Sequence, residues 1–189
     1  YDRQGLPFIY RCVNRLDRNT SGLVVIAKNM VSSAILYEQM KTRSIRRTYF
    51  CAVHGKIEED GTIDAPIGRR AAPSVERFVD FECGQRAVTH YHPLCYRPET
   101  DITALEIRLE TGRTHQIRVH MAYAGHPVAG DSFYGADPDP LLPRQALHSA
   151  KLDFMHPVTQ KQLHFEAPVP EDILSLFPGG IQNPDCFSG

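Results

Sequence analysis

The chain has 189 residues, of which 42% are hydrophobic and 23% are charged, and its formal net charge is −1 at pH 7. This length and apolar content predict one domain with a single well-buried core, and no apolar run approaches the roughly 18 residues that a membrane span requires. Five cysteines, an odd number without a C-x-x-C pair, argue against a disulfide framework or a structural zinc site and favour reduced thiols in a cytoplasmic protein.

Periodic apolar residues and turn signals predict a series of strands interrupted by short helices. In the first half of the chain we expect a strand over 22–28, a helix over 30–42 with Asn29 as its N-cap, a strand over 46–54, and turns and a hairpin over 57–85. In the second half we expect strands over 87–96 and 102–110, a helix over 114–124, strands over 147–154 and 162–166, and a terminal helix over 170–177. Because strands dominate, we expect an α+β fold with a mixed, largely antiparallel sheet core and flanking short helices.

Charge is unevenly distributed along the chain. Residues 1–56 contain ten Lys and Arg and only three acidic residues, a net +7, so the other 133 residues sum to −8. A basic segment beside an acidic remainder can present one face to RNA or another polyanion, and Arg43, Arg46 and Lys56 would then contact phosphates. The alternative is that these charges are scattered over a solvated surface, and the charge balance alone does not decide.

The first cluster of polar residues lies in the loop over 14–22, directly before an apolar run. Asp17 stands between Arg15 and Arg18 among small hydrogen-bonding residues. A neighbouring guanidinium keeps a carboxylate ionised, and an ionised carboxylate can act as a nucleophile. The same residues also form an ordinary Asx or Ser/Thr turn, so the local sequence leaves both interpretations open.

A second cluster opens the strand over 46–54. Alternation along the strand puts Arg47 and Tyr49 on the same face. A tyrosine ring beside cations is a good stacking platform for a nucleic-acid base. The alternative is a core tyrosine with flanking surface charges.

The third cluster covers residues 111–120. On a helix, a spacing of three puts Arg113 beside Gln116 and His115 beside Arg118. Such a helix start can offer N–H donors and guanidinium forks to phosphate, although a polar helix face is the simpler alternative. His115 and His120 are five residues apart with no Glu between them, which is not a zinc pattern, so no metal site is predicted.

Four blocks of sequence, taken in order, resemble one family. RLDRNTSGLVVIAKN, RRTYFCAVHG, LETGRTHQIRVHMAYAGHPVAGDSFYG and LHSAKLDFMHP are similar to the successive signature blocks of the RluA-type RNA pseudouridine synthases. The resemblance implies a catalytic domain over residues 1–177 and a polar tail over 178–189. It implies a monomeric, cytoplasmic enzyme that isomerises uridine to pseudouridine in ribosomal or transfer RNA, without cofactor or metal. A catalytically inactive RNA-binding module derived from the family is the alternative.

The resemblance also implies roles for individual residues. Asp17 matches the family's essential aspartate, and Arg118 matches the arginine that pairs with it. Tyr49 matches the tyrosine that stacks on the target uracil and is a candidate to take the C5 proton. Leu147 matches an apolar residue that lines the uracil pocket. The residues expected to contact RNA or the target nucleotide are Arg15, Thr20, Arg47, Arg113 and His115.

Three departures from the family pattern are visible. Asn14 stands where members commonly have His, and Arg47 where they commonly have Lys. Both changes keep polarity, so we expect them to affect affinity or substrate choice more than chemistry. Members also carry further strands ahead of the Asp17 block, with an NKPAG-like stretch that nothing here matches. We therefore expect the domain to be N-terminally incomplete relative to the family, without part of its core sheet.

Overall fold

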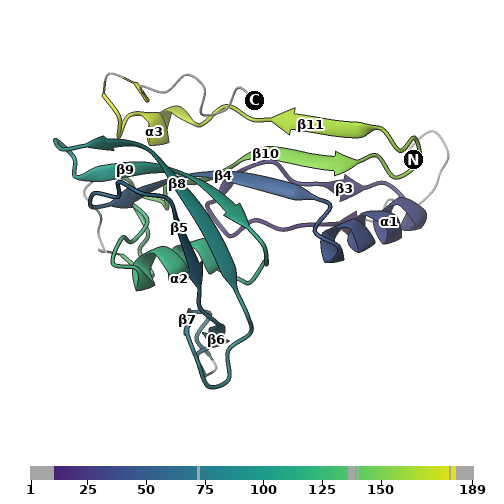
Figure 1. Cartoon of the computed structure of the whole chain (residues 1–189), viewed down its shortest axis with the longest axis horizontal. Helices are drawn as coiled ribbons and strands as arrows, with labels where there is room; N and C mark the ends of the chain where they lie inside the picture. Colours follow the sequence, from purple (N-terminus) through teal and green to yellow (C-terminus); the bar gives the residue numbers. More distant parts are fainter. Residues whose placement is uncertain (1–10, 72, 136–138, 140, 179, 182–189) are drawn as a thin grey trace.

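The computed structural model describes residues 11–71, 73–135, 139, 141–178 and 180–181. Its main sheet is made of β2 (Ser21–Gly22), β4 (Arg46–His54), β5 (Gly61–Asp64), β8 (Val88–Arg97), β9 (Ile102–Leu109), β10 (Leu147–Met155) and β11 (Gln162–Glu166). Six of these strands lie in the order β11-β10-β4-β9-β8-β5 with antiparallel neighbours, and β2 pairs in parallel with β10 (Figure 1). The expected mixed, largely antiparallel sheet is confirmed.

Two small sheets flank the main one. β1 (Arg11–Cys12) pairs with β3 (Ile26–Ala27), and β6 (Ile67–Arg69) pairs with β7 (Arg77–Val79). The β6–β7 hairpin projects from the body of the molecule below α2 (Gln116–Tyr123) in Figure 1. The expected hairpin within residues 57–85 is therefore present.

The first helix, α1 (Met30–Lys41), begins where the sequence predicts. The Asn29 side chain accepts a hydrogen bond from the backbone N–H of Ser32 at 2.8 Å, which satisfies one of the free donors at a helix start. Leu36 on this helix is buried in a small core with residues of β3 and β10. A short terminal helix, α3 (Glu171–Leu174), follows Pro170 as expected.

The main core lies against the centre of the sheet. Phe50, Ile102, Leu105 and Ile107 on β4 and β9 are fully buried. Phe50 packs edge-on against Phe177 after α3, with ring centroids 6.1 Å apart. Helix α2 packs on the other face of the sheet, where it contributes to the same core. The two central strands are thus held from both sides, which gives the site a rigid floor.

Three sequence expectations about elements need correction. Residues 22–28 are not one buried strand, because β2 joins β10 while β3 joins β1, and Val24 and Ile26 are exposed. Residues 61–64 are a strand of the main sheet, β5, where the sequence predicted turns and a hairpin but no strand of the main sheet. Helix α2 begins at Gln116, because His115 has left-handed backbone angles (φ 58°).

Two further points concern the ends of the chain and the membrane. The tail predicted over 178–189 lies almost entirely outside the described residues. Within the part that is described, no helix is long and apolar enough to cross a membrane.

Candidate active site

Most of the predicted site residues meet around one pocket of about 240 Å³. It lies between the loop before β2, the central strands β4 and β10, and the segment that leads into α2. Seven of the nine predicted residues line it: Arg15, Asp17, Thr20, Arg47, Tyr49, Arg113 and Leu147. Its volume suits a single base more than a large cofactor, since sites for drug-sized ligands span about 300–1,000 Å³.

A tight turn presents Asp17 to this pocket. The Asp17 carbonyl oxygen accepts a hydrogen bond from the backbone N–H of Thr20 at 3.0 Å, and Asn19 between them has left-handed angles (φ 69°). Gln145 donates to Thr20 Oγ1 at 3.1 Å and so fastens the turn to the body of the protein. The loop is thus an ordinary turn, and it also presents a carboxylate, because the Asp17 side chain stays 17% exposed at the pocket. The two interpretations of the loop are compatible.

Arg118 reaches the Asp17 carboxylate from α2, but its shortest bonds go elsewhere. Its Nη1 lies 3.7 Å from Asp17 Oδ2, whereas its Nε and Nη2 donate to the two carboxylate oxygens of Asp131 at 2.7 Å each. This is the two-bond fork that arginine forms with carboxylates. The third nitrogen of the guanidinium is thereby aimed at Asp17.

Asp131 is a functional candidate that the sequence reasoning missed. Its side chain is fully buried, and its Oδ1 also accepts from the backbone N–H groups of Phe133 and Tyr134. The rings of Phe133 and Tyr134 pack over the guanidinium of Arg118 at 5.4 and 5.1 Å. The residue lay inside a quoted family block, GDSFYG, but nothing local in the sequence ties this loop aspartate to an arginine thirteen positions earlier.

Burial and ion pairing shift the pKa of Arg118 in opposite directions. Burial favours its neutral form, but hydrogen bonds and charge attraction from Asp131, with a smaller contribution from Asp17, outweigh burial and raise its pKa. Arg118 therefore keeps its positive charge beside Asp17. The charge comes with its own buried counterion, Asp131, which is how a protein can hold a guanidinium away from water.

Tyr49 forms the floor of the pocket on β4. It is buried, and burial is the main reason why its pKa is raised; Arg47 opposes the rise, and the charge of Asp17 adds to it. The phenol is thus protonated at neutral pH and suited to stacking and hydrogen-bond donation. To accept a proton, it would have to release its own at the same time. Leu147 on β10 adds an apolar wall to the pocket.

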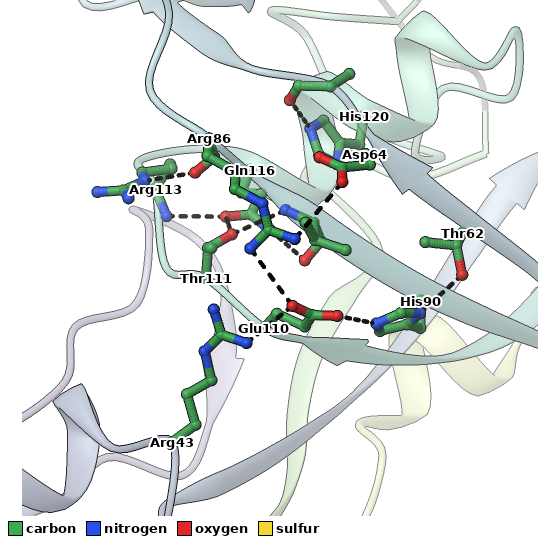
Figure 2. A network of polar contacts seen from close by, with 12 residues as sticks. Arg43, Thr62, Asp64, Arg86, His90, Glu110, Thr111, Arg113, Gln116 and His120 are labelled. Carbon is green, nitrogen blue, oxygen red and sulfur yellow. Dashed lines mark hydrogen bonds and ion pairs between the residues drawn. The ribbon is translucent and has the colours of Figure 1, made fainter.

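A buried polar network fixes the loop that carries Arg113 to the pocket wall (Figure 2). Gln116 Oε1 accepts hydrogen bonds from Thr111 Oγ1 at 2.8 Å and from the Arg113 backbone N–H at 3.0 Å. Its Nε2 donates to the Val88 carbonyl oxygen and to Thr89 Oγ1. Gln116 is turned into the protein, and Arg113 precedes the helix, so the prediction that they share a helix face is wrong.

His115 contacts the two aromatic residues that pack on Arg118. Its Nδ1 is 2.8 Å from the Tyr134 hydroxyl oxygen, and its ring packs against Phe133 and Tyr134. Burial is the main cause of its lowered pKa. It is not among the residues that line the pocket, but the charges of Asp17 and Arg118 both act on its ring, and its contact with RNA stays a prediction.

The charge around the pocket is predominantly positive. Arg15, Arg47 and Arg113 line it and have no ion pair within the described part of the chain, while Asp17 is the acidic residue of its wall. Arg15 Nη2 lies 3.5 Å from Thr114 Oγ1, which brings two sides of the rim together. Among the residues that the structure describes, no group of three or more His, Cys, Asp or Glu is arranged to hold a metal ion.

Comparisons with known proteins point in one direction. A family model described as RNA pseudouridylate synthase matches residues 1–123. The chain is 44% identical over 180 residues to an uncharacterized RNA pseudouridine synthase, YjbO, of Bacillus subtilis, covering 95% of this chain and 62% of that protein. It is 44% identical over 172 residues to ribosomal large subunit pseudouridine synthase D of Nitrosomonas europaea, covering 87% and 49%.

The fold comparison agrees. The structure of human RNA Pseudouridylate Synthase Domain Containing 1 superposes with a TM-score of 0.74 and 27% identity, covering 84% of this chain and 69% of that one. The chain spans 62% and 49% of the length of the two curated relatives described above.

Proposed function

The chain belongs to the RNA pseudouridylate synthase family, as its RluA-type sequence blocks predict, and we propose that it isomerises uridine to pseudouridine in RNA with Asp17 as the essential carboxylate. The observation that carries this proposal is the placement of Asp17 in a base-sized pocket, 3.7 Å from Arg118. We assign residues 1–177 to the catalytic domain and 178–189 to a tail outside it.

The reaction moves the uracil without a net transfer of electrons. The N1–C1′ bond breaks, the base turns, and C5 bonds to C1′; C5 loses its proton and N1 gains one. The bonds and protons balance within one nucleotide, so the proposed enzyme requires no cofactor and no metal. It must retain the detached base and keep water from the sugar.

Asp17 has two candidate roles. It can attack C1′ as a glycosidase nucleophile does, or it can remove the C2′ proton to give a glycal. In both, a negative carboxylate has to lie against the ribose, and the positive guanidinium of Arg118 faces that carboxylate. Asp131 is a positioning residue in this scheme, because it holds Arg118 by two short hydrogen bonds.

Tyr49 and Leu147 would enclose the uracil. The Tyr49 ring offers a stacking surface, and Leu147 on the neighbouring strand β10 adds an apolar surface beside it that excludes water. The hydroxyl of Tyr49 is our candidate to take the C5 proton, in a step where its own proton moves on, because its raised pKa disfavours a free phenolate.

RNA is the proposed partner, held by Arg15, Thr20, Arg47 and Arg113 at the pocket rim. A stacked uridine must be flipped out, at a cost of a few kcal/mol, and phosphate contacts can offset that cost. The relative from Nitrosomonas europaea is named for the large ribosomal subunit, which favours ribosomal over transfer RNA. We propose a monomeric enzyme that acts in the cytoplasm.

Tritium release tests this proposal. Transcripts of ribosomal and transfer RNA labelled with [5-³H]uridine are incubated with the protein, and released tritium is counted beside the pseudouridine content of the product. Release with matching pseudouridine supports the proposal. RNA binding without release from any transcript would contradict it and favour the inactive RNA-binding module.

A further inference from the structure

A second cavity opens beside the pocket of Asp17 and shares part of its wall. It has a volume of about 370 Å³, and Arg113 and Thr114 line both cavities. The rest of its wall comes from the β6–β7 hairpin and the segment after it: Ile67, Gly68, Arg69, Arg77, Cys83 and Gln85. The two cavities are therefore neighbours on either side of Arg113 and Thr114.

Three guanidinium groups line this second cavity, and no carboxylate does. The Arg69 side chain has no hydrogen bond or ion pair among the described residues. Arg113 donates to the side-chain oxygen of Gln85 at 2.9 Å, and Arg77 Nη1 donates to the Val75 carbonyl oxygen at 2.8 Å. These acceptors are neutral, so they orient the guanidiniums without cancelling their charge.

The acidic residues of the hairpin have other partners. Glu76 lies 3.4 Å from Arg70, the neighbour of Arg69 in the chain, which does not line the cavity. Asp80 Oδ1 accepts from the backbone N–H groups of Glu82 and Cys83. The Asp80 carboxylate lies beside Gly68 of the wall, so three guanidinium groups face one nearby carboxylate and the cavity carries a net positive charge.

The hairpin is tied to the layer behind the proposed catalytic carboxylate. The Arg77 backbone N–H donates to the Tyr134 hydroxyl oxygen at 2.9 Å, and the same oxygen lies 2.8 Å from His115 Nδ1. The Tyr134 ring packs on Arg118, which faces Asp17. The hairpin that projects below α2 in Figure 1 thus has a fixed position relative to the site.

We propose that this second cavity binds the phosphodiester group adjacent to the target uridine, with Arg69 and Arg77 as its charge partners. The inference rests on the proposed function, because it takes the target base to lie beside Asp17. A guanidinium can give two parallel hydrogen bonds to phosphate oxygens. A phosphate held there fixes the register of the strand without reading its sequence, and so presents one base at a time to the first cavity.

A cycle of paired changes tests this contact. The RNA probe is a nine-nucleotide oligocytidylate with one central uridine, in which a neutral methylphosphonate replaces one linkage at a time. We expect Arg69→Gln to weaken binding of the fully charged oligomer about tenfold, the effect of one charge-assisted contact. Neutralising one linkage beside the uridine should weaken the parent protein equally and leave Arg69→Gln without further loss.

Arg70→Gln is the matched control, since Arg70 is adjacent, exposed and outside the cavity. Because Arg70→Gln also frees Glu76, it should weaken binding less than Arg69→Gln does, and it should keep the sensitivity to the neutral linkage. Three results would each overturn the inference. The first is that Arg69→Gln and the neutral linkage weaken binding independently, so that their fold-losses in affinity multiply at every linkage. The others are equal losses for Arg69→Gln and Arg70→Gln, and no binding of the charged oligomer by the parent protein. Tritium release by the parent protein separates this failure from a failure of the proposed function, because it reports turnover of the unchanged protein whether or not the second cavity holds the phosphate.

Discussion

The arginines that line the pocket and those on the opposite face of the central sheet differ in whether they have a carboxylate partner. On the face that holds the pocket, Arg15, Arg47 and Arg113 have no carboxylate partner among the described residues. On the opposite face of β5, β8 and β9 two arginines have carboxylate partners, Arg108–Glu106 at 2.7 Å and Arg43–Glu110 at 2.9 Å, and the rings of His90 and His92 hydrogen-bond to Glu110 and Asp60. Pairing, more than the amount of charge, distinguishes the face we propose for RNA.

This difference also divides the basic segment of residues 1–56. Arg15 and Arg47 line the pocket, whereas Arg43 pairs with Glu110 and Lys56 pairs with Glu58. The expectation that the whole segment presents one face to RNA is therefore too broad. Successive side chains along β4 point to opposite faces of the sheet. Arg47 therefore points to the pocket, and Arg46 points to the opposite face, called here the paired face because Arg43 and Arg108 have carboxylate partners on it.

The largest effect is expected from Asp17→Asn. The amide keeps the shape of the side chain but can serve neither as nucleophile nor as base, so turnover should fall at least about a hundredfold. Because the turn around Asp17 is held by backbone and Gln145 contacts, folding and RNA affinity should stay close to those of the parent. Tritium release and filter binding measure the two quantities; activity above a few per cent of the parent would contradict the assigned role.

Removing Arg118 should harm both stability and turnover. Arg118→Ala leaves Asp131 buried without its partner, which costs about 3–5 kcal/mol of unfolding free energy in a buried pair. The comparison variant is Arg108→Ala on the paired face, because an exposed ion pair contributes only about 0–1 kcal/mol to the free energy of unfolding. Urea unfolding of the two variants measures this difference. Equal losses would mean that the Arg118–Asp131 pair is not the support we describe.

Tyr49→Phe sharpens the comparison within the pocket. The variant keeps the stacking ring, so RNA should bind nearly as well, while turnover should fall about a hundredfold if the hydroxyl takes part in proton transfer. Arg113→Ala should show the reverse, with weakened binding and nearly unchanged maximal turnover. A kcat and KM measurement on one transcript separates the two; a Tyr49→Phe enzyme with full kcat would remove the hydroxyl from the mechanism.

The smallest effect concerns pH and the buried histidines. Burial is the main cause of the lowered pKa of His120 and of His148, below the ordinary value of 6.5. The unfolded chain then binds more protons in this range, so the stability from these neutral rings is complete above pH 6.5 and is lost as the pH falls towards their folded pKa values. His120→Gln should flatten this loss in unfolding free energy between pH 7 and 5. An unchanged slope would exclude His120 as its source.

Exposed His164 should act with the opposite sign. Hydrogen bonds that the ring donates to Asp153 and Glu166 raise its pKa, so the protonated ring stabilises the fold below pH 6.5 and that stability is lost as the pH rises through the folded pKa. In His164→Gln we therefore expect a slightly steeper loss of stability on acidification than in the parent. The same unfolding series measures this effect, and a shallower loss would contradict it.

The sequence predicted elements whose pattern is local and missed groups that depend on distant neighbours. β4 begins at Arg46 and ends at His54 as expected, because a β-branched and aromatic run ends at Gly55. Asp131 could not be identified, since its role exists only once α2 and the following loop are folded together. His115 was placed with the RNA contacts by motif alone, yet its left-handed backbone turns it to Tyr134.

The most direct test compares the salt dependence of RNA binding for the two faces. One variant replaces Arg15, Arg47 and Arg113 by Gln, and the other replaces Arg43, Arg46 and Arg108. Each lost phosphate contact should reduce the slope of log K against log salt by about 0.7–0.9, so we predict a drop of about 2–3 for the pocket-face variant and almost none for the paired-face variant. An unchanged slope for the pocket face, with a reduced slope for the paired face, would contradict the account.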